Sequence, residues 1–124
     1  MDLVALDKKL KKNGGRISAE TDLSGVKALT ECIHLCKLAS KVCLEYKQKD
    51  SALICVECAE ICDLTVKFIS CRSEFLRHVL NLCKLVCKRC EQECIKINDQ
   101  HCQDCAKACK KSIDSFPKRI KIKK

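Results

Sequence analysis

The stretch CKLVCKRCEQEC, from Cys83 to Cys94, decides the fold of this chain. Its four cysteines stand at positions i, i+4, i+7 and i+11. On an α-helix each residue advances by about 100°, so all four thiols fall in one stripe about 60° wide. The helix face that would ordinarily bury leucine and isoleucine therefore buries sulfur.

The same pattern recurs in three other segments, so the chain contains four cysteine-bearing repeats. CVECAEIC begins at Cys55 and CQDCAKAC begins at Cys102, with identical spacing. CIHLCKLASKVC begins at Cys32 and carries Ala39 where a further cysteine is expected. Cys71 stands outside the pattern. The thirteen patterned cysteines are Cys32, Cys36, Cys43, Cys55, Cys58, Cys62, Cys83, Cys87, Cys90, Cys94, Cys102, Cys105 and Cys109.

The cysteine content, 14 in 124 residues, is at a level typical of secreted disulfide scaffolds. Two features oppose that interpretation. The first residues, MDLVALDKKLKKNGG, contain no apolar run of the kind found in signal peptides. Cysteines four apart on one helix also cannot join separate elements. We therefore expect a cytoplasmic protein with reduced thiols. The sequence has no run of about 18 apolar residues, so no membrane-spanning helix is predicted.

The formal net charge of +9 permits an anionic partner. The charges are spread along the chain, however, and only residues 118–124 form a basic run. Stacking aromatic residues and a nucleic-acid-binding motif are both missing. We expect a solvated surface and no nucleic-acid partner.

Long helices are favoured by the single proline and three glycines. Residues 1–25 are expected to form an N-terminal extension, with a short amphipathic helix over 2–12 and a connector over 16–24. Residues 117–124 are expected to form a basic tail, because Pro117 prevents continuation of the last helix. The four cysteine segments predict helices over about 26–47, 50–70, 74–97 and 100–115. The expected N-caps are Ser24, Asp50 or Ser51, Ser73 and Asp99.

Four helices joined by short turns predict an all-α fold over residues 26–116, an antiparallel up-down-up-down four-helix bundle with a cysteine-lined core. The turns near residues 49 and 98 then lie at one open end of the bundle. Cys43, Cys55, Cys94 and Cys102 are expected nearest that end, then Cys36, Cys62, Cys87 and Cys109, then Cys32 and Cys83. Ala28, Leu35 and Tyr46 are expected on the core face of the first helix. The opposite end is expected to be closed by Leu29, Phe68, Phe75, Leu76 and Val79.

Metal binding explains thirteen core cysteines better than packing does, because leucine would bury more apolar surface. Thiolates in a core must be neutralised almost one for one. A four-cysteine zinc site keeps a net charge of about −2. A soft monovalent ion gives a neutral core, and Cu(I) prefers thiolate. A zinc or general thiol-metal buffer and a redox-responsive interaction protein remain as alternatives.

The chain resembles the cysteine-rich four-helix-bundle copper storage proteins of bacteria. The resemblance covers about residues 30–112 and rests on CAEIC at 58–62, the 68–75 region, CKLVCKRCEQEC at 83–94 and CQDCAKAC at 102–109. It implies many Cu(I) ions held by thiolates in each bundle, assembly into a homotetramer and, for members without a signal peptide, a cytoplasmic location. Ala39 and Leu80 stand where cysteine is expected in the family, which implies a lower capacity.

Two further residues are candidate metal ligands. His101 lies beside Cys102 at the open end, where it could receive copper first, and Cys71 lies at the junction between two helices. His34 and His78 are expected to face solvent. The outward leucines Leu38, Leu44, Leu82 and Leu85 are compatible with contact between subunits. The sequence contains no constellation of catalytic residues, so we expect no enzyme.

Overall fold

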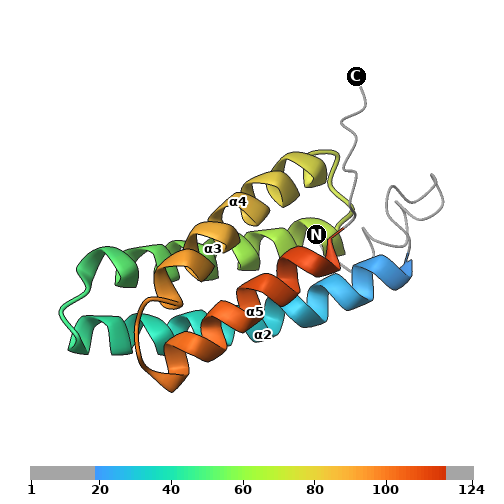
Figure 1. Ribbon diagram of the computed structural model, residues 1–124. Helices are drawn as coiled ribbons and strands as arrows, with labels where there is room; N and C mark the ends of the chain where they lie inside the picture. Colours follow the sequence, from blue (N-terminus) through green and yellow to red (C-terminus); the bar gives the residue numbers. More distant parts are fainter. Residues whose placement is uncertain (1–18, 117–124) are drawn as a thin grey trace.

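Four α-helices make up the part of the chain that the computed structural model describes, residues 19–116. The helices are α2 (Ala19–Glu45), α3 (Lys49–Ser70), α4 (Leu76–Cys94) and α5 (Gln100–Ser115). Each helix packs on its two neighbours: α2 and α4 both contact α3 and α5. Figure 1 shows the four long helices side by side. The predicted four-helix bundle is confirmed over this range. The segments 2–12 and 117–124 lie outside it.

The first helix begins earlier than expected. α2 already runs from Ala19, so residues 19–24 are helical and Ser24 is inside the helix instead of capping it. The prediction of a connector over 16–24 is wrong for these residues. α4 also differs from its expected range, because it begins at Leu76 and ends at Cys94.

Two of the helices end in the same motif, in which a residue with positive φ reverses the chain. Lys47 has φ 59° and follows α2, while Arg72 has φ 51° and follows α3. After α2, the N–H of Gln48 donates to the carbonyl of Cys43 at 2.8 Å. After α3, the N–H of Ser73 donates to the carbonyl of Phe68 at 3.0 Å. These are Schellman motifs, which usually place glycine at the position that lysine and arginine occupy here.

The helix starts follow the expected caps only in part. Asp99 caps α5, because its carboxylate accepts the N–H groups of His101 at 2.8 Å and Cys102 at 3.4 Å. α3 starts after Gln48 without a side-chain cap, so the expected role of Asp50 or Ser51 is wrong. Ser73 accepts the N–H of Phe75 at 3.0 Å, but the helix begins beyond it.

The two ends of the core differ in chemistry. The end opposite the turns at 46–48 and 95–99 is filled by Leu29, Thr65, Ile69, Leu76 and Leu80, all buried, which we call the apolar end. The other end, between those two turns, we call the mouth.

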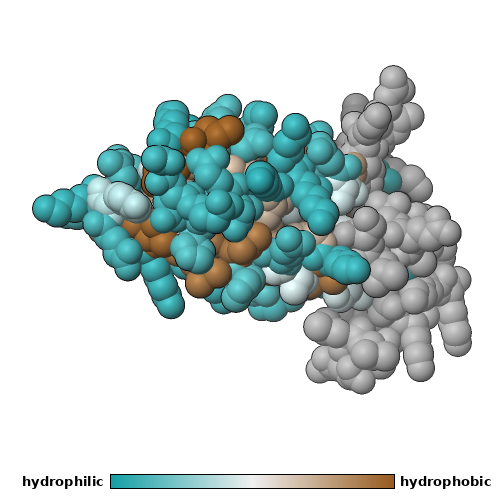
Figure 2. All heavy atoms as spheres, turned by 60° about the horizontal axis from the view of Figure 1, so that its bottom comes forward, coloured by the Kyte–Doolittle hydropathy of each residue, from teal (hydrophilic) through white to brown (hydrophobic). Residues whose placement is uncertain are grey.

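Several apolar side chains lie elsewhere than expected. Phe75, expected to close the apolar end, is 57% exposed, because it lies before the first residue of α4 and not on the buried face of that helix. Tyr46 is 52% exposed, because it follows α2. Phe68 and Val79 are half-buried. Figure 2 shows a largely hydrophilic face with separate apolar patches. Among the described residues, no helix is both long enough and apolar enough to cross a membrane.

Candidate metal centre

Each helix contributes one stripe of cysteine to the core. All thirteen patterned cysteines have no exposed surface. We call them the sulfur row. The i, i+3 and i+4 spacing places them on one face of each helix, and bundle packing turns the four faces toward one another. Cys71 is half-buried in the α3–α4 turn, where its thiol lies 3.9 Å from the carbonyl of Phe68. The structure therefore brings thirteen of the candidate cysteines together and leaves Cys71 apart.

Ten of these cysteines form four groups of four, and the sulfur atoms within each group all lie within 4.8 Å of one another. Successive groups share two residues. The first two share Cys32 and Cys58, the second and third share Cys36 and Cys109, and the last two share Cys90 and Cys105. The groups are Cys32, Cys58, Cys62 and Cys87; Cys32, Cys36, Cys58 and Cys109; Cys36, Cys90, Cys105 and Cys109; and Cys55, Cys90, Cys94 and Cys105. The sulfur atoms therefore form one continuous array.

The two ends of the sulfur row, toward the mouth and toward the apolar end, differ in their sulfur pairs. At the mouth, the sulfur atoms of Cys55 and Cys94 are 3.4 Å apart, and those of Cys43 and Cys102 are 4.0 Å apart. At the apolar end, Cys83 lies 3.8 Å from Cys62. The expected placement of these four cysteines near the mouth is confirmed.

The order in the middle of the array differs from the expected one. Cys62 is expected level with Cys36 and Cys87, and it does lie 3.7 Å from Cys87. It also lies 3.8 Å from Cys83, which is expected deeper. Cys36 instead lies 3.5 Å from Cys105. Counting turns from the mouth does not fix the axial offset between helices, which depends on their packing and on the turns at 46–48 and 95–99.

The next positions of the stripes hold other small or apolar side chains. Thr65, seven residues after Cys58, is fully buried, and its hydroxyl donates to the carbonyl of Ile61 at 2.6 Å. Ser112, seven residues after Cys105, is also fully buried and donates to the carbonyl of Ala28 at 3.3 Å. Neither residue was predicted from the sequence as a boundary of the sulfur row. Their spacing from the cysteines was the available signal.

The acid–base properties of the thiols at the mouth follow from their burial. Burial first, and the neighbouring Cys43 thiolate second, raise the pKa of Cys102 to about 12. Burial also raises the pKa of Cys43, outweighing its hydrogen bond with Cys102. Both thiols are therefore protonated at neutral pH when no cation is present.

Deeper in the array, one thiolate depends on neighbours that stay protonated. Hydrogen bonds with Cys62 and then Cys87 lower the pKa of Cys83 to about 5. Hydrogen bonds with Cys32 and Cys58, in turn, raise the pKa of Cys62. The array cannot hold all of its sulfurs as thiolates by itself, because the negative charges would repel one another in a dry core. Full ionisation requires cations among the sulfur atoms.

The sulfur separations match shared metal ligation. All 14 cysteines are free thiols, and the closest pair, at 3.4 Å, is well beyond a disulfide bond of about 2.05 Å. A metal–sulfur bond of about 2.3 Å separates two ligands by about 3.8 Å in a tetrahedral site, about 4.0 Å in a planar three-coordinate site and about 4.6 Å in a linear site. Hydrogen-bonded sulfur neighbours lie 3.4 to 4.0 Å apart, close to the first two values, and all sulfurs within a group lie within 4.8 Å.

Cysteine is the sole ligand type in the clusters found among the described residues from 25 to 116. His34, His78 and His101 are all exposed. His101 lies in the first turn of α5, where its N–H donates to Asp99, and its ring belongs to none of the four groups. The outward placement predicted for His34 and His78 is confirmed.

Comparison with known proteins agrees with this geometry. The sequence model of the copper storage protein family, Csp, matches residues 18–118. Among solved structures, the chain is similar to the Cu(I)-bound copper storage protein BsCsp3, with 31% sequence identity and a TM-score of 0.73. That similarity covers 77% of this chain and 93% of the other. A comparison with curated protein sequences found no match. The four-helix fold, the thiol array and the family match together place this chain in the copper storage protein family.

Proposed function

We propose that this protein stores many Cu(I) ions as thiolate complexes inside its bundle. The observation that carries the proposal is the continuous array of four cysteine groups, each sharing two residues with the next. The similarity to a Cu(I)-bound copper storage protein supports it. The thirteen cysteines of the sulfur row are the proposed ligands.

Charge favours Cu(I) as the stored ion. Cysteine binds metal as thiolate, and each thiolate brings one negative charge into a dry core. One Cu(I) per thiolate leaves the core neutral, whereas each four-cysteine zinc site leaves about two negative charges. Cu(I) also accepts two or three sulfur ligands. A sulfur shared by neighbouring groups can bridge two ions.

The zinc alternative conflicts with the sharing of residues. Among the four groups, at most two can be chosen that have no cysteine in common. Two closed tetrahedral sites would use eight cysteines and leave the other buried thiols without a metal. An anaerobic Cu(I) titration of the reduced protein against a competing chelator distinguishes the alternatives. Uptake on the order of ten ions per chain supports storage, whereas saturation at about two to four points to discrete sites.

A redox-responsive protein is the alternative from a different class. Redox-sensing cysteines are accessible and have a partner in reach. Here the whole sulfur row is buried, and only Cys71 has some exposure. The test is to expose the reduced, metal-free protein to air and to analyse it by mass spectrometry. Formation of one defined disulfide together with a change of oligomeric state would contradict storage.

His101 is proposed to assist uptake as the first ligand at the mouth. Its exposure and its position next to Cys102 support this role. His101→Ala is expected to slow Cu(I) loading several-fold without changing capacity, and His34→Ala, an exposed histidine on α2, serves as the control. Equal loading rates in the two variants would remove this role. Cys71 stays a candidate ligand, which Cys71→Ser tests by metal count.

The remaining expectations concern assembly, location and activity. Exposed leucines on α2 and α4, with Leu44, Leu82 and Leu85 each at least 50% exposed, support a homo-oligomer, and the family resemblance suggests a tetramer. Native mass spectrometry tests the number of subunits. The fourteen free thiols support a cytoplasmic location, which cell fractionation tests. A storage role without enzymatic activity is proposed, because the array contains no pairing of nucleophile and base.

A further inference from the structure

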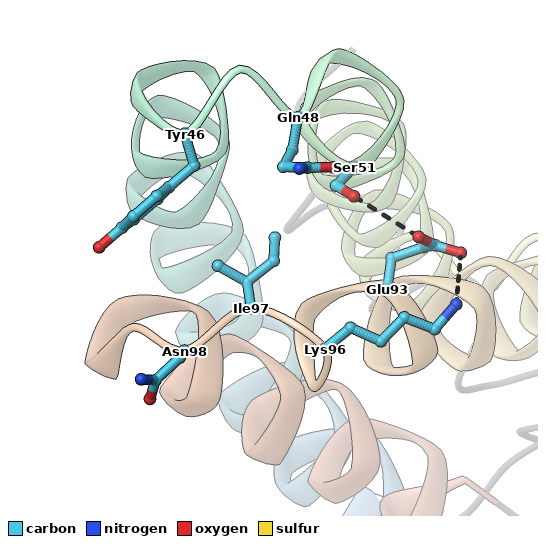
Figure 3. A pocket seen from close by; sticks show the side chains of 7 residues that line it. All are labelled: Tyr46, Gln48, Ser51, Glu93, Lys96, Ile97 and Asn98. Carbon is cyan, nitrogen blue, oxygen red and sulfur yellow. Dashed lines mark hydrogen bonds and ion pairs between the residues drawn. The ribbon is translucent and has the colours of Figure 1, made fainter.

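The mouth of the bundle carries a pocket of about 540 Å³ that the sulfur row does not use. It lies between the α2–α3 turn and the α4–α5 turn. Figure 3 shows Tyr46 and Gln48 on one side and Ile97 with Lys96 on the other, with Glu93 beside Ser51. Its volume falls in the range of small-molecule sites. The lining residues are Tyr46, Gln48, Ser51, Glu93, Lys96, Ile97 and Asn98.

The pocket lies at the same end of the bundle as the Cys55 and Cys94 sulfur pair. Ser51 precedes Cys55 by one helical turn on the same face of α3, and Glu93 directly precedes Cys94 on α4. The Ser51 hydroxyl donates to the Glu93 carboxylate at 3.5 Å. This bond bridges α3 and α4 next to the Cys55 and Cys94 sulfurs, which are 3.4 Å apart. A molecule in the pocket therefore contacts one residue a helical turn from Cys55 and one residue adjacent to Cys94 in the sequence.

The lining predicts a small polar ligand with charges of both signs. The Lys96 side chain is 69% exposed, and its ammonium lies 3.6 Å from the carboxylate of Glu93. Glu93 also pairs with Arg89 at 3.2 Å, so Lys96 is the pocket charge most open to a ligand. Gln48 and Asn98 add carboxamides that donate and accept hydrogen bonds. Tyr46 and Ile97 give an aromatic ring and an aliphatic wall. An amino acid or short peptide, with its own carboxylate and ammonium, matches this set.

The preference of Cu(I) for soft ligands narrows the class of pocket ligand further. Cu(I) prefers soft ligands, so a carrier that delivers it needs a thiol. We propose that the pocket binds a low-molecular-weight amino-acid or peptide thiol and positions the Cu(I) that it carries above Cys55 and Cys94. This inference rests on the proposed storage function and adds the chemical class of the donor.

The exchange that follows is balanced in charge and atoms. A Cu(I) ion held by two carrier thiolates passes to two protein thiols, so two carrier–copper bonds break and two cysteine–copper bonds form. The two cysteine protons move to the two carrier thiolates, which leave as neutral thiols. Copper stays Cu(I) throughout, and no oxidant or reductant takes part. The same steps in reverse release copper to the carrier.

The test compares loading from two carriers in anaerobic buffer. Cu(I) bound to glutathione is the charged probe, and Cu(I) bound to 2-mercaptoethanol is the uncharged one. With the wild-type chain, the initial loading rate should saturate as the Cu(I)–glutathione concentration rises. Loading from 2-mercaptoethanol should rise linearly over the same range. A linear rate with both carriers would overturn the proposal.

Charge reversal at the pocket sharpens the test. Lys96→Glu should raise the half-saturating Cu(I)–glutathione concentration about three- to five-fold, the upper part of the range for loss of one exposed charge contact. Lys88→Glu, at an α4 lysine outside the pocket that is 60% exposed, is the matched control and should change this concentration less than about two-fold. Equal effects of the two variants would overturn the pocket assignment.

Capacity separates the two proposals. Both variants keep all thirteen cysteines, so each should still bind on the order of ten Cu(I) ions at the end point. A capacity of about two to four ions in the wild-type chain would contradict storage itself, whatever the rates show. Unchanged capacity with rates that do not respond to Lys96 would contradict only the carrier site.

Discussion

The sulfur row and the apolar end are built from the same four helices but do different work. In one region the inward positions hold small thiols, and in the other they hold Leu29, Ile69, Leu76 and Leu80. Leucine buries more apolar area than cysteine, so the apolar end contributes more stability per position to the metal-free bundle. The sulfur row contributes the ligands. The comparison indicates that folding and metal capacity are carried by different segments of the same stripes.

The largest expected effect comes from weakening the apolar end. Leu80→Ala removes a fully buried side chain and should lower the free energy of unfolding of the metal-free protein by about 2–5 kcal/mol. Urea unfolding followed by circular dichroism measures it. Leu85→Ala, at a position 63% exposed on the same helix, should change stability by less than about 0.5 kcal/mol. Similar losses in both variants would show that the apolar end is not special.

The second prediction weakens the sulfur row and leaves the apolar end intact. Cys58 belongs to two of the four cysteine groups, and a serine hydroxyl does not replace a thiolate for Cu(I). Cys58→Ser should lower the copper count by on the order of two ions per chain. Val56→Ser, at a position 47% exposed on the same helix, is the control and should leave the copper count unchanged. An unchanged count in Cys58→Ser would contradict the shared-ligand array.

A third prediction moves the boundary between the regions. Thr65 lies on the α3 stripe and is fully buried, so Thr65→Cys extends the sulfur row by one position. It should add on the order of one Cu(I) ion. Ser70→Cys is the control: its hydroxyl also donates to the carbonyl four residues earlier, at 2.9 Å, but it lies off the stripe. If both variants gained copper, position on the stripe would not matter.

The last prediction concerns the pH dependence of the stability of the metal-free protein. Burial raises the pKa of Cys102 from 9.0 to about 12. Between these values the unfolded chain releases a proton that the folded chain retains, so the folded state binds more protons. The stabilisation is complete below pH 9 and is lost as the pH rises toward 12. Denaturant midpoints across this range measure the slope.

The matched variant for this titration is Cys102→Ser, which has no thiol at the mouth. Its stability should fall less steeply above pH 9 than that of the wild-type chain. Identical slopes would assign the loss to other groups, such as the lysines.

Sequence periodicity was sufficient to predict the four stripes and the buried position of all thirteen cysteines. It was sufficient because a 3.6-residue period fixes which side chains share a helix face. The Asp99 cap followed from the same local chemistry. The four cysteines nearest the mouth could also be predicted, because the turns that bound the helices are short and polar.

The remaining features depend on interactions that no local pattern records. Lys47 and Arg72 end their helices with positive φ, although neither residue type favours that conformation. The pairing of Cys36 with Cys105 depends on the axial offset of two helices. The pocket exists only because two turns distant in sequence meet at the mouth. Each of these is a property of tertiary packing.

The sharing of two cysteines between successive groups has a consequence for partly filled molecules. The groups behave as neighbouring sites on a one-dimensional lattice, in which occupancy at one site changes the affinity of the next. The first ion bears the cost of removing protons from a cluster of thiols, and its neighbour finds two of those ligands already ionised. Copper then fills outward from a nucleus. We therefore expect nearly full and nearly empty chains to predominate at half saturation.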